Sequence, residues 1–219
     1  MKLYLIRHAE STDNCRHIYA GVRDSHLTER GILQAKALAM QFVDDQSVRR
    51  VYCSTLTRAL QTVSVLTQIC SEVDVIPTEL LNEKDFGSLE GKSFSAKSLT
   101  ENDGESESSI HNRLINFLSD LCSDLTTMAD TDSVLIVSHG VAINQLLLIL
   151  QRRFRFHQDW PMLGNAMFHM ITLDFSQDRF FHAVVREHHH LVHLANVSRI
   201  SGLVKYDPKQ TRLDNFSAK

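Results

Sequence analysis

The stretch Leu3-Tyr4-Leu5-Ile6-Arg7-His8 decides how the rest of the chain is interpreted. Its first four residues are apolar and favour β-structure, which predicts a short buried strand. An arginine and a histidine follow directly, at the point where this strand would end. In an open α/β sheet, ligands bind beyond the carboxyl ends of the strands. Arg7 and His8 are therefore candidate site residues.

Strands and helices alternate along most of the chain that follows. Apolar spacing predicts further strands at 48–53, 73–76 and 133–137, and helices at 28–44, 56–70, 110–128 and 141–150. Two more strands are predicted at 167–175 and 180–186, joined by a polar turn at 176–179. The pattern predicts one α/β domain with a mostly parallel central sheet, helices on both faces and an edge hairpin.

Two stretches lack the periodicity of the main body. The segment at about 84–109 is rich in Gly, Ser, Lys and Glu, and we expect it to form a short insertion or cap over the domain. The residues at 198–219 have no clear pattern, and we expect a partly disordered tail. The domain itself is expected to span 1–197.

Composition excludes several classes of protein. The 219 residues carry a net charge of -3, which provides neither a basic field for nucleic acid nor a polybasic membrane anchor. The longest apolar run, at 146–150, is far shorter than the roughly 20 residues of a membrane helix. Arg7 ends the first apolar run before a signal-peptide core could form. We expect a cytoplasmic protein that binds neither nucleic acid nor membrane.

A second strand end repeats the arrangement of the first. Ser138-His139-Gly140 follows the predicted strand at 133–137, and Ser54 with Arg58 follows the strand at 48–53. A single histidine is more often structural than catalytic. Two histidines at strand ends, with two arginines nearby, favour a functional site.

The residues around these positions resemble the histidine phosphatase superfamily, also called the phosphoglycerate mutase-like fold. The resemblance extends over nearly the whole chain, and Ala9 replaces a glycine of the family pattern. The matching stretches are RHAESTDN at 7–14, GVRDSHLTERG at 21–31, STLTRALQT at 54–62, LLNEKDFGSLEG at 80–91, GES at 104–106 and VSHG at 137–140.

The resemblance implies a role for each residue of the site. His8 would be the nucleophile that forms a phosphohistidine, and Glu83 the general acid that protonates the leaving alkoxide. From the sequence alone, Glu83 is one of several neighbouring carboxylates, and the family pattern selects it. Forked guanidinium groups and other fixed donors suit the oxygens of a phosphoryl group. The residues assigned to phosphate binding are Arg7, Asn14, Arg58, His139 and Gly140, of which Arg7, Arg58 and His139 would also take part in catalysis.

The segment between Gly91 and Gly104 bears on the choice of substrate. It is short and holds two cations, Lys92 and Lys97. A second phosphate would require a further cationic cluster there. We therefore expect a histidine acid-type phosphatase that hydrolyses a small phosphorylated metabolite, similar in pattern to alpha-ribazole phosphatases. The alternatives are a phosphoglycerate mutase, a phosphoprotein phosphatase, and a catalytically silent module that binds a phosphorylated ligand.

No metal or cofactor is expected. The histidines at 188–190 and His193 invite a metal interpretation, but no carboxylate or thiol completes a recognisable site. The four cysteines lack a C-x-x-C pair, which argues against disulfides and thiolate zinc sites. The hairpin at 167–186 lies at a predicted sheet edge, through which two copies could pair as a homodimer.

Overall fold

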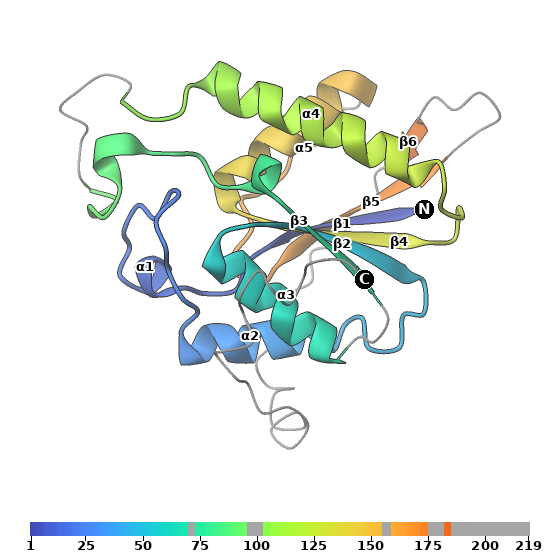
Figure 1. The fold of residues 1–219 in the computed structure, drawn as a ribbon, viewed down its shortest axis with the longest axis horizontal. Helices are drawn as coiled ribbons and strands as arrows, with labels where there is room; N and C mark the ends of the chain where they lie inside the picture. The colour runs from blue at the N-terminus through green and yellow to red at the C-terminus, as the bar shows by residue number, and fades with distance from the viewer. Residues whose placement is uncertain (70–72, 96–102, 155–158, 175–181, 185–219) are drawn as a thin grey trace.

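The protein is described by a computed structural model that covers residues 1–69, 73–95, 103–154, 159–174 and 182–184. Six strands form one sheet in the order β3-β2-β4-β1-β5-β6 (Figure 1). Strands β1 to β4 are mutually parallel. At one side of the sheet, β5 runs antiparallel to β1, and β6 runs antiparallel to β5. The predicted α/β class, with its mostly parallel sheet, is confirmed.

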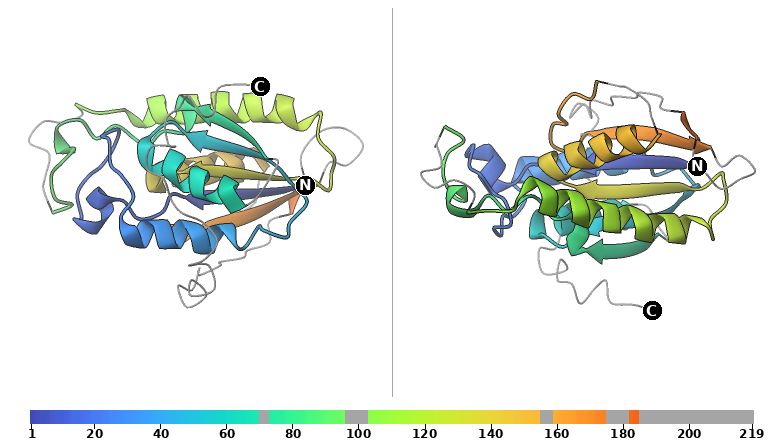
Figure 2. Two further views of the ribbon diagram at one scale, coloured as in Figure 1. Left: turned by 60° about the horizontal axis from the view of Figure 1, so that its bottom comes forward. Right: turned by 90° about the horizontal axis from the view of Figure 1, so that it is seen from above.

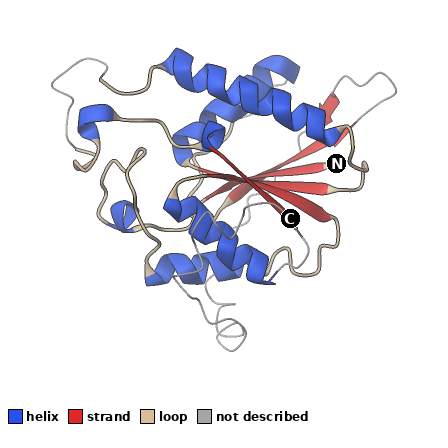
Figure 3. Cartoon of the chain, viewed as in Figure 1, coloured by secondary structure: helices blue, strands red, loops and turns tan. Residues whose placement is uncertain are grey.

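The elements follow the alternation that the sequence predicts (Figure 3). The strands are β1 (Lys2–Arg7), β2 (Val48–Ser54), β3 (Asp74–Thr78), β4 (Ser133–Ser138), β5 (Phe168–Asp174) and β6 (His182–Val184). The helices are α1 (Thr12–Cys15), α2 (Glu29–Ala39), α3 (Thr57–Ile69), α4 (Glu107–Leu125) and α5 (Gly140–Phe154), with 3-10 turns η1 (Glu79–Leu81) and η2 (Gly87–Leu89).

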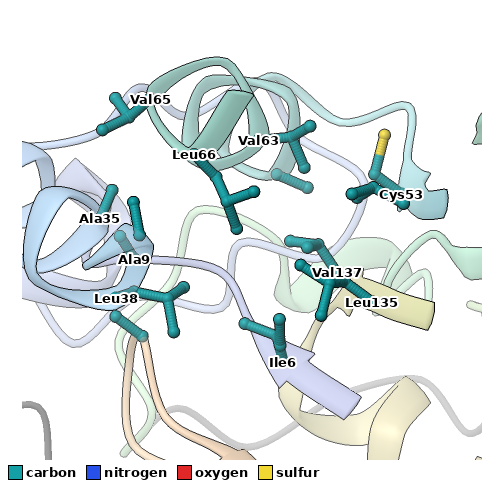
Figure 4. Packing of buried hydrophobic residues seen from close by; sticks show 14 of the residues in the cluster. Ile6, Ala9, Ala35, Leu38, Cys53, Val63, Val65, Leu66, Leu135 and Val137 are labelled. Carbon is teal, nitrogen blue, oxygen red and sulfur yellow. The ribbon is translucent and has the colours of Figure 1, made fainter. Parts of the chain in front are cut away.

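Two hydrophobic cores cover the two faces of the sheet. Alternate residues of β1 divide between them, because successive side chains of a strand point to opposite faces. Tyr4 and Ile6 pack with α2 and α3, whereas Leu3 and Leu5 pack with α4 and α5. Figure 2 shows the same layers from two further directions, and Figure 4 shows the first core around Ile6. This packing fixes β1 rigidly, and the histidine of the site follows its last residue.

Register brings the two histidine-bearing strand ends together. Strands β1 and β4 are neighbours, and Arg7 pairs with Ser138. The backbone N–H of His8 donates to the carbonyl of Ser138 at 2.9 Å. His8 and His139 therefore lie side by side at the carboxyl ends of these two strands.

Several element boundaries differ from the sequence prediction; for example, α5 continues to Phe154 rather than ending at 150. Three further differences have a physical reason. Helix α2 ends at Ala39 rather than near 44. Phe42 lies in the turn that follows but packs against Tyr4 in the core, so its apolar spacing continues that of the helix in the sequence. Strand β3 continues through Pro77, which an edge strand tolerates because its outer side needs no donor. Helix α4 begins at Glu107, since the Ser106 hydroxyl caps it.

Other predictions concern residues beyond the described ranges. These are the hairpin turn at 176–179, the tail at 198–219, the histidines at 188–190 and 193, and Lys97. Within the described part of the chain, no helix is both long and apolar enough to cross a membrane.

Candidate active site

The loops beyond the carboxyl ends of β1, β2 and β4 enclose a cavity of about 310 Å³. In Figure 1 these loops, with α1 and η2, lie at the end of the sheet opposite the N-terminus. The rings of His8 and His139 lie 4.9 Å apart, and Arg58 comes from the first turn of α3. The described lining residues are Arg7, His8, Asn14, Ile18, Tyr19, Ala20, Gly21, Arg58, Glu83, Phe86, Phe94, Gly140, Val141 and Met162.

His8 is held in the form that a nucleophile requires. Its Nδ1 lies 2.7 Å from the carbonyl oxygen of Ala9, which can only accept, so Nδ1 carries the proton and Nε2 keeps a free lone pair. Burial, and then the charges of Arg58 and Arg7, hold the pKa of His8 well below its usual value, against the opposing effect of the Ala9 hydrogen bond. The imidazole is therefore neutral at physiological pH.

Arg58 is a buried cation that binds the protein with all three of its nitrogens. Nη1 donates to the carbonyl of Arg23 at 3.0 Å, Nη2 to that of Gly21 at 2.6 Å, and Nε to Nδ1 of His139 at 3.2 Å. Burial lowers the pKa of Arg58 to about 10, with a partly opposing effect of Glu83. It stays charged at neutral pH and ties the loop at 21–23 to the site.

Arg7 brings a second guanidinium to the site. Its Nη1 donates to the carbonyl of Leu163 at 2.6 Å, while Nε is buried with no hydrogen-bond partner among the described residues. Gly140 packs closely on the guanidinium, since a Cβ there would lie 3.7 Å from Cζ. Buried donors in proteins are nearly always satisfied. The Arg7 guanidinium lines the cavity and is therefore a candidate to bind an anion there.

His139 lies behind the cavity rather than in its lining. Because a guanidinium only donates, Nδ1 of His139 accepts from Arg58, and Nε2–H donates to the Ser54 hydroxyl at 2.7 Å. Both nitrogens are thus engaged by the protein. In this arrangement His139 orients Arg58, whereas the sequence predicts an N–H that contacts phosphate directly.

Asn14 is oriented by a residue that the sequence did not single out. Asn165 donates from Nδ2 both to the carbonyl of His8 at 3.1 Å and to Oδ1 of Asn14 at 3.0 Å. The backbone N–H of Ser11 donates to the same Oδ1 at 3.2 Å. With Oδ1 facing these donors, Nδ2 of Asn14 is the part of the amide available to a ligand.

Of the four neighbouring carboxylates at 79–90, Glu83 is the one that lines the cavity. Its two carboxylate oxygens accept the N–H groups of Val141 at 3.2 Å and Ala142 at 3.1 Å, in the first turn of α5. Glu90 instead binds the backbone at 22 and 86, Asp85 binds that at 87, and Glu79 is exposed. The assignment of Glu83 as general acid remains a prediction, and its position in the cavity lining is compatible with that role.

Asn82 is a second residue that the sequence did not reveal. Its Oδ1 accepts from the Ser54 hydroxyl at 2.7 Å and from the backbone N–H of Thr55 at 3.0 Å. Ser54 also receives the N–H of His139. Asn82 thus joins the end of β2 to the loop that carries Glu83, the next residue along the chain.

Part of the predicted insertion, at 91–94, is hydrogen-bonded to the loop at 17–19. Tyr19 donates its backbone N–H to Lys92 and accepts from Gly91, both at 2.9 Å. Phe94 donates to the carbonyl of His17 at 2.9 Å. Gly21 adopts a positive φ of 51°, and a side chain there would collide with the Glu90 carboxylate. The positive φ and the contact with Glu90 explain why position 21 is a glycine.

Metal ligands and reactive thiols do not gather at this site. The described part of the chain contains no cluster of three or more metal-ligating side chains. Three cysteines within it (Cys15, Cys53 and Cys122) are free. Burial raises the pKa of the Cys53 thiol to about 12, which makes this group unreactive.

Comparisons with known proteins identify the class that this fold and site define. The family model "Histidine phosphatase superfamily (branch 1)" matches residues 3–186. A probable phosphatase of Schizosaccharomyces pombe is 30% identical over 98% of this chain and 79% of its own length. The chain belongs to the histidine phosphatase superfamily.

Solved structures share the fold. The alpha-ribazole phosphatase of Shigella flexneri is 26% identical and superimposes with a TM-score of 0.66, covering 85% of this chain and 95% of its own. A phosphoglycerate mutase of Bacillus anthracis str. Sterne has a TM-score of 0.68 at 20% identity, covering 91% of this chain and 96% of its own. The phosphoglycerate mutase-like fold expected from the sequence is confirmed.

The two buried histidines predict that acid destabilises the fold. Burial holds the pKa of both His8 and His139 below the unfolded value, so that below about pH 6.5 the unfolded chain takes up protons that the folded one does not. Their stabilisation is complete above that pH and is lost as pH falls. As the pH falls from 7 to 5.5, each histidine should lower the free energy of unfolding by up to about 1 kcal/mol.

Urea unfolding of the wild type and His8→Gln at these two pH values measures this effect. The variant should lose about 1 kcal/mol less than the wild type on acidification. An equal loss in both proteins would show that His8 is not held neutral in the fold.

Proposed function

We propose that this protein is a metal-independent phosphomonoesterase that works through a phosphohistidine. The observation that carries the proposal is that His8, with its unprotonated Nε2, and the guanidinium of Arg7 line one cavity. The imidazole can attack phosphorus, and the guanidinium can hold an oxygen of the same phosphoryl group.

The reaction follows from these positions in two steps. Nε2 of His8 attacks phosphorus, the ester P–O bond breaks, and the departing alkoxide takes a proton from Glu83. Water then attacks phosphorus and gives a proton to the Glu83 carboxylate, while the bond between phosphorus and Nε2 of His8 breaks. Inorganic phosphate leaves, and both side chains are restored. Arg7, Arg58 and Asn14 surround the phosphoryl oxygens, and the first turn of α5 from Gly140 completes this end of the cavity.

The charges around the cavity favour an ester with a single phosphate. Among the described lining residues, the cations are Arg7 and Arg58, and both lie next to His8. A neighbouring cavity beyond Glu83 is lined by further carboxylates, and its cation Arg113 is paired with Glu105 at 2.7 Å. Among the described lining residues of the two cavities, no further unpaired cation is present to bind a second phosphate, so a small monophosphate fits better than a bisphosphate-dependent mutase reaction.

Phosphate release from a panel of esters tests the proposal. Sugar phosphates, phosphoglycerates, nucleotides, phosphopeptides and phenyl phosphate are each offered with and without EDTA. We expect release from small monophosphates, with a rate that the chelator leaves unchanged. Loss of activity in EDTA, or phosphoglycerate interconversion without net release, would contradict the proposal. A preference for phosphopeptides would favour a phosphoprotein phosphatase.

Two further expectations accompany this function. Cys15, Cys53 and Cys122 are free, which favours a reducing compartment such as the cytoplasm as the site of action. Pairing of two copies along the sheet edge at β6 remains a prediction, which the molecular mass in solution would test.

A further inference from the structure

The mouth of the cavity is apolar and partly exposed. Phe94 and Met162 line it with 50% and 62% of their surface accessible, which is unusual for large hydrophobic side chains. Tyr19 joins Phe94 to Phe86, with ring centroids 5.0 Å and 5.2 Å from its own. Ile18 and Val141 extend the same surface; these six residues are called the apolar mouth below.

Charged groups in the lining are confined to the reacting end. They are Arg7, Arg58 and Glu83, all of which have a part in the proposed reaction. Lys92 follows Gly91 in the segment next to the apolar mouth but is not among the residues that line the cavity. Beyond the phosphate end, the alcohol of a bound ester would therefore meet mainly carbon surface, and none of the described lining residues there is a cation or a carboxylate.

We propose that the preferred substrates are phosphate monoesters of small apolar alcohols, alkyl or aromatic, whose hydrocarbon part covers the apolar mouth. This inference rests on the proposed phosphatase function and narrows its substrate class. Covering Phe94 and Met162 removes their apolar surface from water, so that binding strengthens with each carbon that reaches them.

The mouth is also preorganised to receive such a group. Backbone hydrogen bonds between the segments at 17–19 and 91–94, which meet in an isolated antiparallel bridge, hold Tyr19 and Phe94 at fixed positions. The tyrosine hydroxyl lies 3.4 Å from the carbonyl of Phe94, so it is directed toward the backbone. A cavity of about 310 Å³ holds a phosphate with a short chain or one ring.

A homologous series of primary alkyl phosphates isolates this effect. Ethyl, butyl and hexyl phosphate have nearly the same leaving group and differ in apolar length. We expect kcat/KM to rise about 2- to 4-fold for each added methylene, which corresponds to partial to full burial of that group. Glycerol 3-phosphate, a polar alcohol of similar length, should react at least about 10-fold more slowly than butyl phosphate.

The double variant Phe94→Ala/Met162→Ala tests the residues themselves. Both side chains are largely exposed, so their truncation should leave the fold intact, which thermal unfolding verifies. The ratio of kcat/KM for hexyl to ethyl phosphate should fall by about 10-fold. The control is Leu33→Ala, which removes a similarly exposed side chain (41%) from α2, outside the lining, and should keep the wild-type ratio.

The outcomes separate the two proposals. Hydrolysis of every ester with no dependence on chain length, or a preference for glycerol 3-phosphate, would overturn the proposed role of the apolar mouth in substrate preference. The phosphatase function would remain in place. An unchanged hexyl-to-ethyl ratio in the double variant would assign the preference to other residues and overturn the proposed site. No hydrolysis of any ester, phenyl phosphate included, would reject the phosphatase function itself.

Discussion

His8→Ala is expected to lower kcat for phosphate release by at least about 10⁴-fold, the largest effect of any single substitution. The variant removes the proposed nucleophile, the Nε2 of a cavity-lining histidine that the Ala9 hydrogen bond leaves unprotonated. Neither arginine can replace it, because a guanidinium has no available lone pair. The wild type should accumulate a phosphoenzyme that is labile in acid and stable in base, whereas the variant should form none.

Rapid quenching with radiolabelled substrate measures this difference. Because His8 is buried, His8→Gln serves as a second variant that fills more of the space, and thermal unfolding confirms that both variants fold. The control is His111→Ala, which removes an imidazole from α4 outside the cavity and should retain wild-type turnover. Substantial turnover in both His8 variants would reject a phosphohistidine mechanism.

Glu83→Gln is expected to have the second largest effect, and that effect should depend on the leaving group. Alkyl phosphates, whose alkoxides need a proton, should lose about 10²- to 10⁴-fold in kcat, as is typical for loss of a general acid. Phosphoenzyme formation from p-nitrophenyl phosphate should lose less than about 10-fold, because its phenolate departs without help. The contrast follows from the position of Glu83, the one carboxylate in the cavity lining.

Pre-steady-state release of the alcohol measures the first step for each ester separately. The matched control is Glu79→Gln, an exposed glutamate in the same segment that lies outside this cavity. It should behave as the wild type with both classes of ester. Equal losses on alkyl and p-nitrophenyl phosphate in Glu83→Gln would assign Glu83 a structural role at the start of α5.

The sequence predicts the parts of the site that depend on local pattern. Arg7 and His8 follow an apolar run, and His139 follows another, so the alternation alone places them at strand ends. Parallel pairing of β1 with β4 then brings them together. Local pattern does not identify Glu83, because several carboxylates share its segment. The family pattern selects it from the sequence, and in the structure it is the one of these carboxylates that lines the cavity.

The hydrogen-bond network behind the site could not be predicted. Asn165 reaches Asn14 across 151 positions of sequence, and nothing in the residues around it signals this contact. The two bonds of His139 depend on Arg58 and Ser54, which come from other elements. Such contacts follow from the final packing of distant segments, whereas periodicity reports local burial.

The backbone hydrogen bonds between the segments at 17–19 and 91–94 bear on how this protein could acquire new specificities. Main-chain groups make these bonds, so the shape of the two segments is nearly independent of which side chains they carry. Tyr19 and Phe94 can therefore be exchanged in evolution without moving the loop that Arg58 anchors through Gly21 and Arg23. Substitutions in the apolar mouth can therefore change substrate preference, while the residues of the chemical step keep their positions at the ends of the strands.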